Sequence, residues 1–305
     1  MPKVSIIGAG NVGGTLALRI VERQFASVTL IDIASSLACA KAFDIKDSQK
    51  SLNKQFDIVG TTDFSYLKDS NVIVITAGVA RKPGMTREDL LLINSKIIKD
   101  ISAQIKQFCS HDTIVIIVTN PLDIITYIAY KELGFMREKI IGFGMNLDAS
   151  RFANIISEKL SVSVTEINPL VVASHGQEML PLARFTLVRG KPLTEICNKT
   201  IIDEIIKLTM NRGAEIVSLY KTGSAYYAPS AGLLELIEII LNDQKKQTTA
   251  SCFLNGEYGL KDVCLGVPVV LSRDGIEKII ELDLNLEEKE LFQKAASVIK
   301  NSLPK

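Results

Sequence analysis

The chain has 305 residues, enough for two domains of ordinary size and for a full hydrophobic core without disulfides or metal staples. Its 35 Lys and Arg residues balance 34 Asp and Glu residues, and the resulting net charge of +1 argues against nucleic acid or any other partner bound by bulk charge. If its chemistry needs an imidazole near neutral pH, only His111 and His175 can supply one.

The first half of the chain alternates short apolar runs with longer helical patterns. Strands are predicted at Val4–Ile7, Val28–Ile31, Ile58–Val59, Val72–Ala77, Ile114–Val118 and Ile140–Gly142, and helices at Val12–Arg23, Leu37–Ser48, Thr86–Phe108 and Pro121–Leu133. This alternation predicts an α/β fold in which residues 1–144 form a Rossmann-type, doubly wound parallel sheet with right-handed crossovers.

The second half of the chain has a mixed pattern. Antiparallel ribbons or strands are predicted at Arg184–Val188, after Gly190, and at Thr248–Phe253 and Val267–Leu271, and helices at about Thr194–Tyr220, Ala231–Leu241 and Leu286–Lys300. We therefore expect a mixed α+β domain for substrate binding and catalysis over residues 145–305, with the boundary near Gly142–Asn146.

A glycine-rich turn joins the first predicted strand to the first predicted helix. Gly8 suits a tight turn, Gly10 has no side chain to keep a pyrophosphate away from the backbone, and Gly13 lets the helix pack closely on the strand. Free N–H groups and the positive end of the helix dipole then favour phosphate. The predicted cofactor-binding residues of this turn are Gly8, Ala9, Gly10, Asn11, Val12 and Gly13.

Asp32 strengthens this prediction because it ends the second predicted strand, about 20 residues after Gly13. A carboxylate there accepts hydrogen bonds from both adenosine ribose hydroxyls and repels a 2′-phosphate, so NAD is favoured over NADP. The alternative is a glycine turn of some other α/β protein, with Asp32 as a solvated residue at a strand end.

The cysteines and the apolar runs indicate the compartment. Five cysteines without a CxxC pair, and two histidines far apart in sequence, predict no metal site and a reducing environment. The first strand-like run begins at Lys3, which leaves no room for a cleavable leader, and no apolar run approaches the ~20 residues of a membrane-spanning helix. We expect a cytoplasmic protein with no membrane partner.

Two further segments contain candidate catalytic residues. One is ITAGVARKPGMTR, directly after the fourth predicted strand, where doubly wound folds bind their ligands; the other runs from NLDASRF to SHG. Together with GAGNVG, VTNPLD, KTGSAYYAP and GEYG, in this order over nearly the whole length, they show that the chain resembles NAD-dependent malate dehydrogenases of the subgroup closest to lactate dehydrogenases. The resemblance implies a two-domain enzyme that uses NAD and forms homodimers or homotetramers.

The resemblance also implies a catalytic pair. His175 matches the proton donor and acceptor of the family, and Asp148 matches the carboxylate that holds the histidine ring and stabilises its charged form. Arg151 matches the arginine that clamps the C1 carboxylate of the substrate. Because Asp148 and Arg151 are three residues apart in a helical pattern, both can project from one face.

Other family roles fall on loops and strand ends. Arg87 matches the arginine that polarises the substrate carbonyl and the developing alkoxide. Asn120 matches a residue near both nicotinamide and substrate. Asn94, Val118 and Thr119 are carried over to the cofactor side.

The residue at position 81 decides between malate and lactate. A malate-type substrate carries two carboxylates, and Arg151 binds only one of them. Arg81 holds the family position that discriminates, where lactate-type enzymes usually have an uncharged residue. A bidentate pair in a closed site would discriminate by roughly 10² to 10⁴. We therefore expect a small dicarboxylate substrate, malate or oxaloacetate.

The segment around His175 departs from the family pattern. Ala173 and Ser174 precede it where relatives often have two glycines, and Gln177 follows Gly176 where relatives usually have an aspartate. Pro169 interrupts a predicted strand that leads to the site, and a proline cannot donate to a strand ladder. These departures change the hydrogen bonding that we expect around His175.

Two alternatives stay open. An L-lactate or other 2-hydroxyacid dehydrogenase would use the same scaffold, and Arg81 is the residue that distinguishes it. A non-catalytic NAD-binding protein would keep the glycine turn and Asp32 but would not need the catalytic set together, namely His175, Asp148, Arg151 and Arg87.

Overall fold

The computed structural model describes residues 1–80 and 84–303. Its N-terminal half contains the predicted parallel sheet, in the order β3-β2-β1-β4-β5-β6, with every neighbouring pair parallel. The strands are β1 (Lys3–Ile7), β2 (Ser27–Ile31), β3 (Ile58–Thr61), β4 (Val72–Ile75), β5 (Ile114–Ile117) and β6 (Ile140–Gly142). This strand order is that of a Rossmann fold, so the predicted fold class is confirmed.

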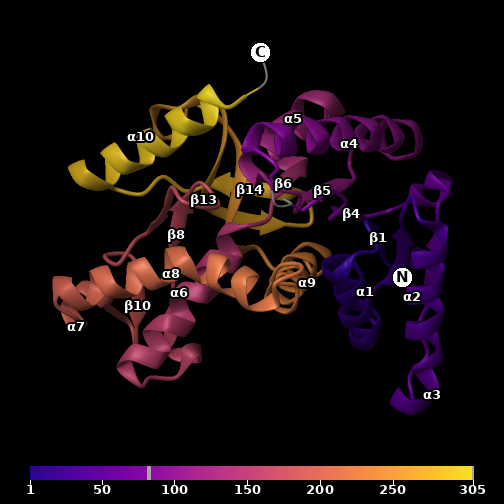
Figure 1. Cartoon of the computed structure of the whole chain (residues 1–305), viewed down its shortest axis with the longest axis horizontal. Coiled ribbons are helices and arrows are strands. Elements are labelled where there is room, and N and C mark those ends of the chain that lie inside the picture. The colour runs from indigo at the N-terminus through magenta and orange to yellow at the C-terminus, as the bar shows by residue number, and fades with distance from the viewer. Residues whose placement is uncertain (81–83, 304–305) are drawn as a thin grey trace.

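Helices cover both faces of this sheet, which explains why the strands are continuous apolar runs (Figure 1). The four residues of β4 and the four of β5 are all buried. The helices of this half are α1 (Asn11–Arg23), α2 (Ser35–Asp47), α3 (Gln49–Leu52), α4 (Arg87–Phe108) and α5 (Leu122–Leu133), with 3-10 turns η1 (Phe64–Leu67) and η2 (Arg137–Lys139). Helices α4 and α5 pack together on one face, whereas α1 packs against α9 from the second half on the other.

Most described strands of the second half extend the same sheet, and three of them, at Ile167–Asn168, Leu187–Val188 and Lys191–Pro192, form a small separate antiparallel sheet. Its strands are β7 (Ile167–Asn168), β8 (Val171–Ala173), β9 (Met179–Pro181), β10 (Leu187–Val188), β11 (Lys191–Pro192), β12 (Lys246–Asn255), β13 (Lys261–Ser272) and β14 (Gly275–Ile279). The antiparallel hairpin β12–β13 joins β6 where Ser251 pairs with Gly142, and β13 continues to β8 and β9. In the described residues the result is one 11-stranded sheet.

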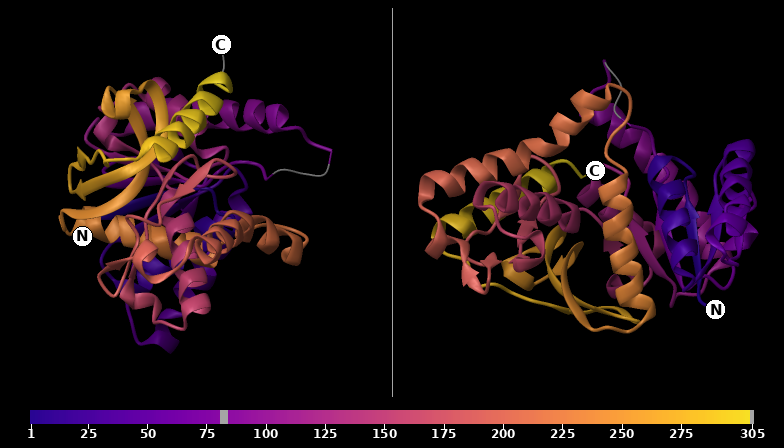
Figure 2. Two further views of the ribbon diagram at one scale, coloured as in Figure 1. Left: turned by 90° about the vertical axis from the view of Figure 1, so that its left-hand side faces the viewer. Right: turned by 90° about the horizontal axis from the view of Figure 1, so that it is seen from below.

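Helices surround this extension (Figure 2). They are α6 (Met145–Leu160), α7 (Leu193–Ile196), α8 (Lys199–Tyr220), α9 (Tyr227–Leu241) and α10 (Leu286–Asn301), with 3-10 turns η3 (Val164–Glu166) and η4 (Glu257–Gly259). Of the described helices, none combines the length and the apolar character that crossing a membrane requires.

Several boundaries differ from the prediction for local reasons. The single helix expected at Thr194–Tyr220 is two helices, because the side chain of Asn198 accepts a hydrogen bond from the Ile201 N–H at 3.0 Å and caps a new start. The hairpin strands β12 and β13 are longer than predicted. Pro169 lies between β7 and β8, so it costs the sheet no ladder hydrogen bond.

Candidate functional site

The three predicted glycines occupy positions that a side chain would disturb in different ways. Gly8 has φ +110°, and a Cβ on it would lie 2.6 Å from both the Ala77 nitrogen and Thr76 Oγ1. A Cβ on Gly13 would overlap the Gly8 carbonyl oxygen, so this glycine allows α1 to approach β1. Gly10 is the N-cap of α1 and faces open space, with no described atom within 4 Å of its missing Cβ. The free N–H groups of α1 therefore have room for a pyrophosphate.

Asp32 follows β2 and lies against the glycine turn. Its Oδ2 accepts a hydrogen bond from the Ala9 N–H at 2.6 Å, and its Oδ1 accepts one from the Ala34 N–H at 3.0 Å. Each carboxylate oxygen can accept a further hydrogen bond, so both can still serve ribose hydroxyls. Lys41 of α2, which the sequence analysis did not identify, donates from Nζ to the Gly10 carbonyl at 2.9 Å, on the same turn.

Asn94 connects two loops at the carboxyl edge of the sheet. Its buried side chain accepts a hydrogen bond from the Val79 N–H at 2.9 Å and donates to the Asn120 carbonyl at 2.7 Å. Thr119 Oγ1 donates to the Ala77 carbonyl at 2.7 Å, and the Val118 N–H donates to the Ile75 carbonyl. The segments after β4 and β5 are thus held together, and the side chain of Asn120 is exposed beside them.

Asp148 and His175 form a short side-chain contact between the two halves of the predicted catalytic pair. Asp148 lies on the first turn of α6 and is fully buried, and His175 follows β8 with 17% of its side chain exposed. Nδ1 of His175 is 2.6 Å from Oδ2 of Asp148. Burial lowers the pKa of His175, but the charge and hydrogen bond of Asp148 and the charge of Asp123 raise it by more, so the net shift is upward.

Arg151 shares the same carboxylate from one helical turn further along α6. Its Nη1 donates to Oδ1 of Asp148 at 3.1 Å, and its side chain is 13% exposed. Its Nε is buried and has no hydrogen-bond partner among the described residues. Gly213 of α8 lies beside the guanidinium, because a Cβ there would be 3.2 Å from Nη1. Arg151 is therefore held next to His175 with donor capacity left for an anion.

Asp123, on the first turn of α5, belongs to this site but is not among the residues predicted from the sequence. Its carboxylate is 2% exposed and accepts hydrogen bonds from Ser174 Oγ, from the His175 N–H and from Ser251 Oγ. The motif VTNPLD contains this aspartate, but roles were predicted only for Val118, Thr119 and Asn120 of that motif. A charged residue at the start of an otherwise apolar helix was the available signal.

The predicted substrate arginines of the loop are described only in part. Arg81 lies outside the described residues. Arg87 is the first residue of α4, whose start is fixed by a capping box in which Thr86 Oγ1 accepts from the Asp89 N–H and the Thr86 N–H donates to Asp89 Oδ2, each at 3.0 Å. The loop between β4 and α4 thus ends at the carboxyl edge of the sheet.

The remaining sequence features lie away from this cluster. His111 is exposed, precedes β5, and packs against the Phe135 ring in a tilted arrangement, with ring centroids 4.7 Å apart, at the amino edge of the sheet. Gln177 is exposed. In the described part of the chain, no group of three or more His, Cys, Asp or Glu side chains could hold a metal ion.

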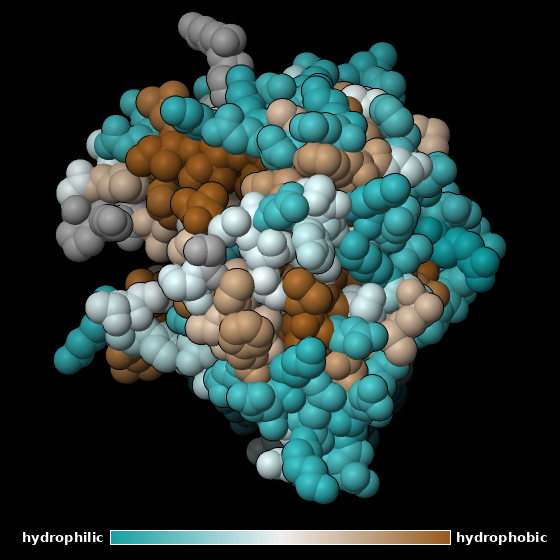
Figure 3. All heavy atoms as spheres, turned by 90° about the vertical axis from the view of Figure 1, so that its right-hand side faces the viewer, coloured by the Kyte–Doolittle hydropathy of each residue, from teal (hydrophilic) through white to brown (hydrophobic). Residues whose placement is uncertain are grey.

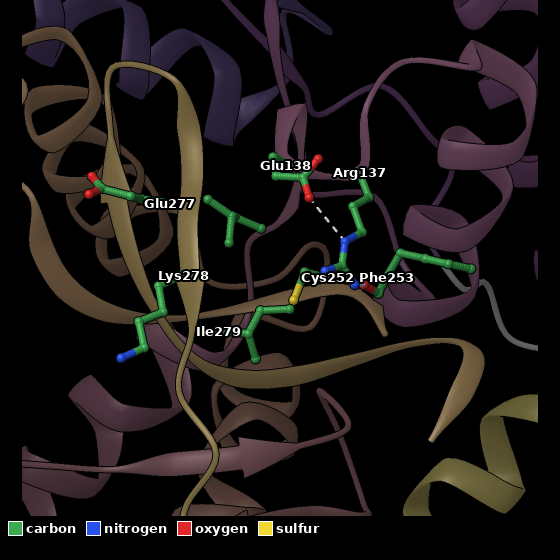
Figure 4. A pocket seen from close by; sticks show the side chains of 8 residues that line it. Arg137, Glu138, Cys252, Phe253, Glu277, Lys278 and Ile279 are labelled. Carbon is green, nitrogen blue, oxygen red and sulfur yellow. Dashed lines mark hydrogen bonds and ion pairs between the residues drawn. The ribbon is translucent and has the colours of Figure 1, made fainter. Parts of the chain in front are cut away.

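A small cavity lies elsewhere, between η2, β12 and β14 (Figure 4). Arg137 points toward Glu138 there, with Nε 3.0 Å from Oε1, and Cys252 and Ile279 line the opposite side. Its volume of about 60 Å³ suits a few water molecules. None of the predicted site residues lines it.

The comparisons with known proteins cover the whole chain. Residues 2–142 match the model for the lactate/malate dehydrogenase NAD-binding domain, and residues 145–305 match that for the lactate/malate dehydrogenase alpha/beta C-terminal domain. Malate dehydrogenase of Chlorobium chlorochromatii is 43% identical over 98% of this chain and 97% of its own. Among solved structures, malate dehydrogenase of Cryptosporidium parvum superposes with TM-score 0.95 at 36% identity, covering 99% of this chain and 98% of that one. Lactate dehydrogenase of the same organism, complexed with lactic acid and NAD, gives 0.94 at 31%, covering 99% and 96%.

Proposed function

Because the chain belongs to the lactate/malate dehydrogenase family, we propose that it catalyses the reversible, NAD-dependent oxidation of (S)-malate to oxaloacetate. The observation that carries this proposal is the contact of one buried carboxylate, Asp148, with both His175 and Arg151. An imidazole that exchanges a proton near neutral pH, beside a cation that binds a carboxylate, is what oxidation of a 2-hydroxy acid requires.

The residues of the first half fit the cofactor. The open space at Gly10, the uncapped N-terminus of α1 and the carboxylate of Asp32 suit the pyrophosphate and the ribose of NAD. We assign Gly8, Ala9, Gly10, Asn11, Val12, Gly13, Asp32, Asn94, Val118, Thr119 and Asn120 to this role. When bound, NAD supplies the acceptor for the hydride that leaves the hydroxyl-bearing carbon.

The other residues bind the substrate and move its proton. Neutral His175 removes the hydroxyl proton through Nε2, because Nδ1 is held by Asp148. The carboxylate of Asp148 stabilises the imidazolium that results. Arg151 binds the C1 carboxylate, Arg87 polarises the C2 oxygen, and Asn120 completes the pocket from the end of β5.

Malate is favoured over lactate by Arg81, which would pair with the second carboxylate. The curated relative described above, from Chlorobium chlorochromatii, carries the name malate dehydrogenase, which supports the same choice. The division between substrate classes therefore depends on a residue in the loop between β4 and α4. We also retain the division of the chain into residues 1–144 for the cofactor and 145–305 for the substrate.

The test is to measure kcat/KM for oxaloacetate and for pyruvate with NADH under identical conditions. Oxaloacetate should be preferred by roughly 10² to 10⁴, since pyruvate leaves one arginine without a partner. Equal or better turnover of pyruvate would overturn the malate assignment and leave the 2-hydroxyacid dehydrogenase intact. No turnover of either, with tight NADH binding, would favour a non-catalytic NAD-binding protein.

We propose that the enzyme is a cytoplasmic homodimer or homotetramer. Large apolar side chains are exposed on two helices, with Leu37 and Phe43 on α2 and Val217 and Leu219 on α8. The face in Figure 3, which carries α2, shows separate hydrophobic patches among hydrophilic residues. Such patches suit an interface between identical subunits. Light scattering on the purified chain gives the subunit number.

A further inference from the structure

Three hydrogen-bond donors converge on the carboxylate of Asp123. Oδ2 accepts from Ser174 Oγ at 2.8 Å and from the His175 N–H at 3.0 Å, and Oδ1 accepts from Ser251 Oγ at 2.6 Å. All three donors come from the C-terminal half, at β8 and β12, whereas Asp123 belongs to α5. A buried carboxylate is costly unless it is paired in this way, so its presence requires an explanation.

The backbone that Asp123 holds is strained. Ala173, directly before Ser174, has φ +72°, a left-handed region that is unfavourable for a residue with a Cβ. Gly176, directly after His175, has φ +137°. Glycine adopts such a φ without steric cost, but the conformation of Ala173 persists only when the surroundings determine it. Two of the three hydrogen bonds to Asp123 come from Ser174 and His175, which lie between Ala173 and Gly176. These two hydrogen bonds therefore fix the turn that places the imidazole.

The charges around His175 give Asp123 a second effect. The buried charged groups in the described surroundings of the ring are Asp123, Asp148 and Arg151. Burial raises the pKa of Asp123, whereas the hydrogen bonds that it accepts from Ser251, Ser174 and His175 oppose this shift by stabilising the ionised form. With Asp123 ionised, the group carries one net negative charge when His175 is neutral and none when His175 is protonated. The charges of Asp148 and Arg151 cancel each other. The net negative charge that favours the imidazolium therefore comes from Asp123.

We propose that Asp123, with Ser174 and Ser251, is a positioning site that fixes the strained turn at His175 and makes the protonated imidazole the electrically balanced state of the pocket. The proposal rests on the proposed function only for its effect on turnover. A buried aspartate that merely joined two halves of the fold would contribute to stability and leave the proton affinity of His175 unchanged.

The experiment uses the two histidines of the chain. In the untagged, full-length protein labelled with [¹³Cε1]histidine, two imidazole signals are expected, and His111→Gln identifies the one from His175. Asp123→Asn keeps the shape of the side chain and removes its charge. It should lower the pKa of His175 by about one unit and kcat for oxaloacetate by roughly 10- to 100-fold, with a smaller change in KM.

Ser174→Ala separates position from charge, because it removes one donor and keeps the carboxylate. It should lower kcat severalfold while the pKa of His175 stays near the wild-type value. Ser102→Ala is the matched control: Ser102 is buried in α4, and its hydroxyl has no hydrogen-bond partner among the described residues. It should change neither quantity.

An unchanged pKa of His175 in Asp123→Asn, or a wild-type kcat in Ser174→Ala, would overturn the proposal. If Asp123→Asn does not fold, kcat of Ser174→Ala decides alone, and a decrease supports the proposal. The titration needs no substrate, so it tests the role of Asp123 even if the wild-type enzyme fails to reduce oxaloacetate. Such a failure would count against the proposed function and not against the positioning role of Asp123.

Discussion

Asp148 holds His175 through Nδ1 at 2.6 Å, which leaves Nε2 as the only ring nitrogen available to a substrate. The carboxylate accepts the Nδ1–H, so it selects the tautomer whose Nε2 takes up a proton during oxidation. Because the opposite oxygen of Asp148 contacts Arg151, the proton-transfer group and the carboxylate clamp share one anchor.

Replacement of Asp148 by asparagine tests this anchor. Asp148→Asn should lower kcat by about 10² to 10⁴, as loss of the orienting carboxylate permits the wrong tautomer. It should also lower the pKa of His175, because Asp148 is its strongest stabilising charge. Steady-state kinetics over a pH range measures both effects. Asp112→Asn, at the exposed amino edge of the sheet, is the control and should match wild type.

The raised pKa of His175 predicts opposite pH profiles for the two directions. Oxaloacetate reduction needs protonated His175, so its kcat/KM should hold at low pH and fall as pH rises through the raised pKa. Malate oxidation needs neutral His175 and should rise through the same value. A shared midpoint at or below the ordinary value of ~6.5 would contradict the upward shift.

Stability should follow from the same shift. A histidine whose pKa is higher in the folded state contributes stability that is fully present below its unfolded pKa of ~6.5 and is lost as pH rises through the folded pKa. The free energy of unfolding of the cofactor-free enzyme should therefore decline over that window. In His175→Gln the decline should become smaller, because the contribution of the imidazole is removed, and urea titrations at several pH values can measure this difference.

Arg81→Gln tests the substrate assignment. The variant should lose kcat/KM for oxaloacetate by roughly 10² to 10⁴, because the second carboxylate loses its cation, and should lose little for pyruvate. Lys68→Gln is a control that removes an exposed lysine elsewhere. Equal losses on both substrates would mean that position 81 does not discriminate between them.

Gly213→Ala separates substrate binding from stability. Glycine inside a helix costs about 0.5–1 kcal/mol relative to alanine, so by helix propensity the variant should be as stable as wild type or more so. The added Cβ would lie 3.2 Å from Nη1 of Arg151 and displace the guanidinium. KM for oxaloacetate should rise about threefold to tenfold, a change of about 1 kcal/mol.

The control for this variant is Asn211→Ala, at an exposed position of the same helix. It makes a similar change in helix propensity away from Arg151, and its KM should stay at the wild-type value. A wild-type KM in Gly213→Ala would show that the guanidinium can move aside without cost. Thermal unfolding of both variants gives the stability comparison.

Local patterns in the sequence predicted the first half well. Parallel strands buried on both faces are short β-branched runs, as at β4 and β5, and turn glycines such as Gly8 and Gly13 have few other uses. The division at Asn198 was also within reach, because asparagine is a favoured N-cap. The spacing of apolar residues along the segment does not by itself show such a cap.

Contacts between distant segments could not be predicted in this way. Nothing local to Ser251 indicates that its strand joins β6 or that its hydroxyl reaches Asp123. The same holds for Ser174, which as a departure from the family pattern raised a question about His175 but gave no partner. Pairing across more than a hundred residues depends on tertiary packing, which the spacing of residues along one segment does not encode.

Ser251 contacts the N-terminal half twice, through its backbone opposite Gly142 and through its hydroxyl on Asp123. Exchange of halves between two relatives would therefore take the acceptor from one parent and all its donors from the other. A chimaera could retain every residue that meets malate and still misplace its histidine. Recombination between such enzymes is thus constrained by the three donors to Asp123, which are the hydroxyls of Ser174 and Ser251 and the His175 N–H. A survey of substrate-contacting positions would overlook them.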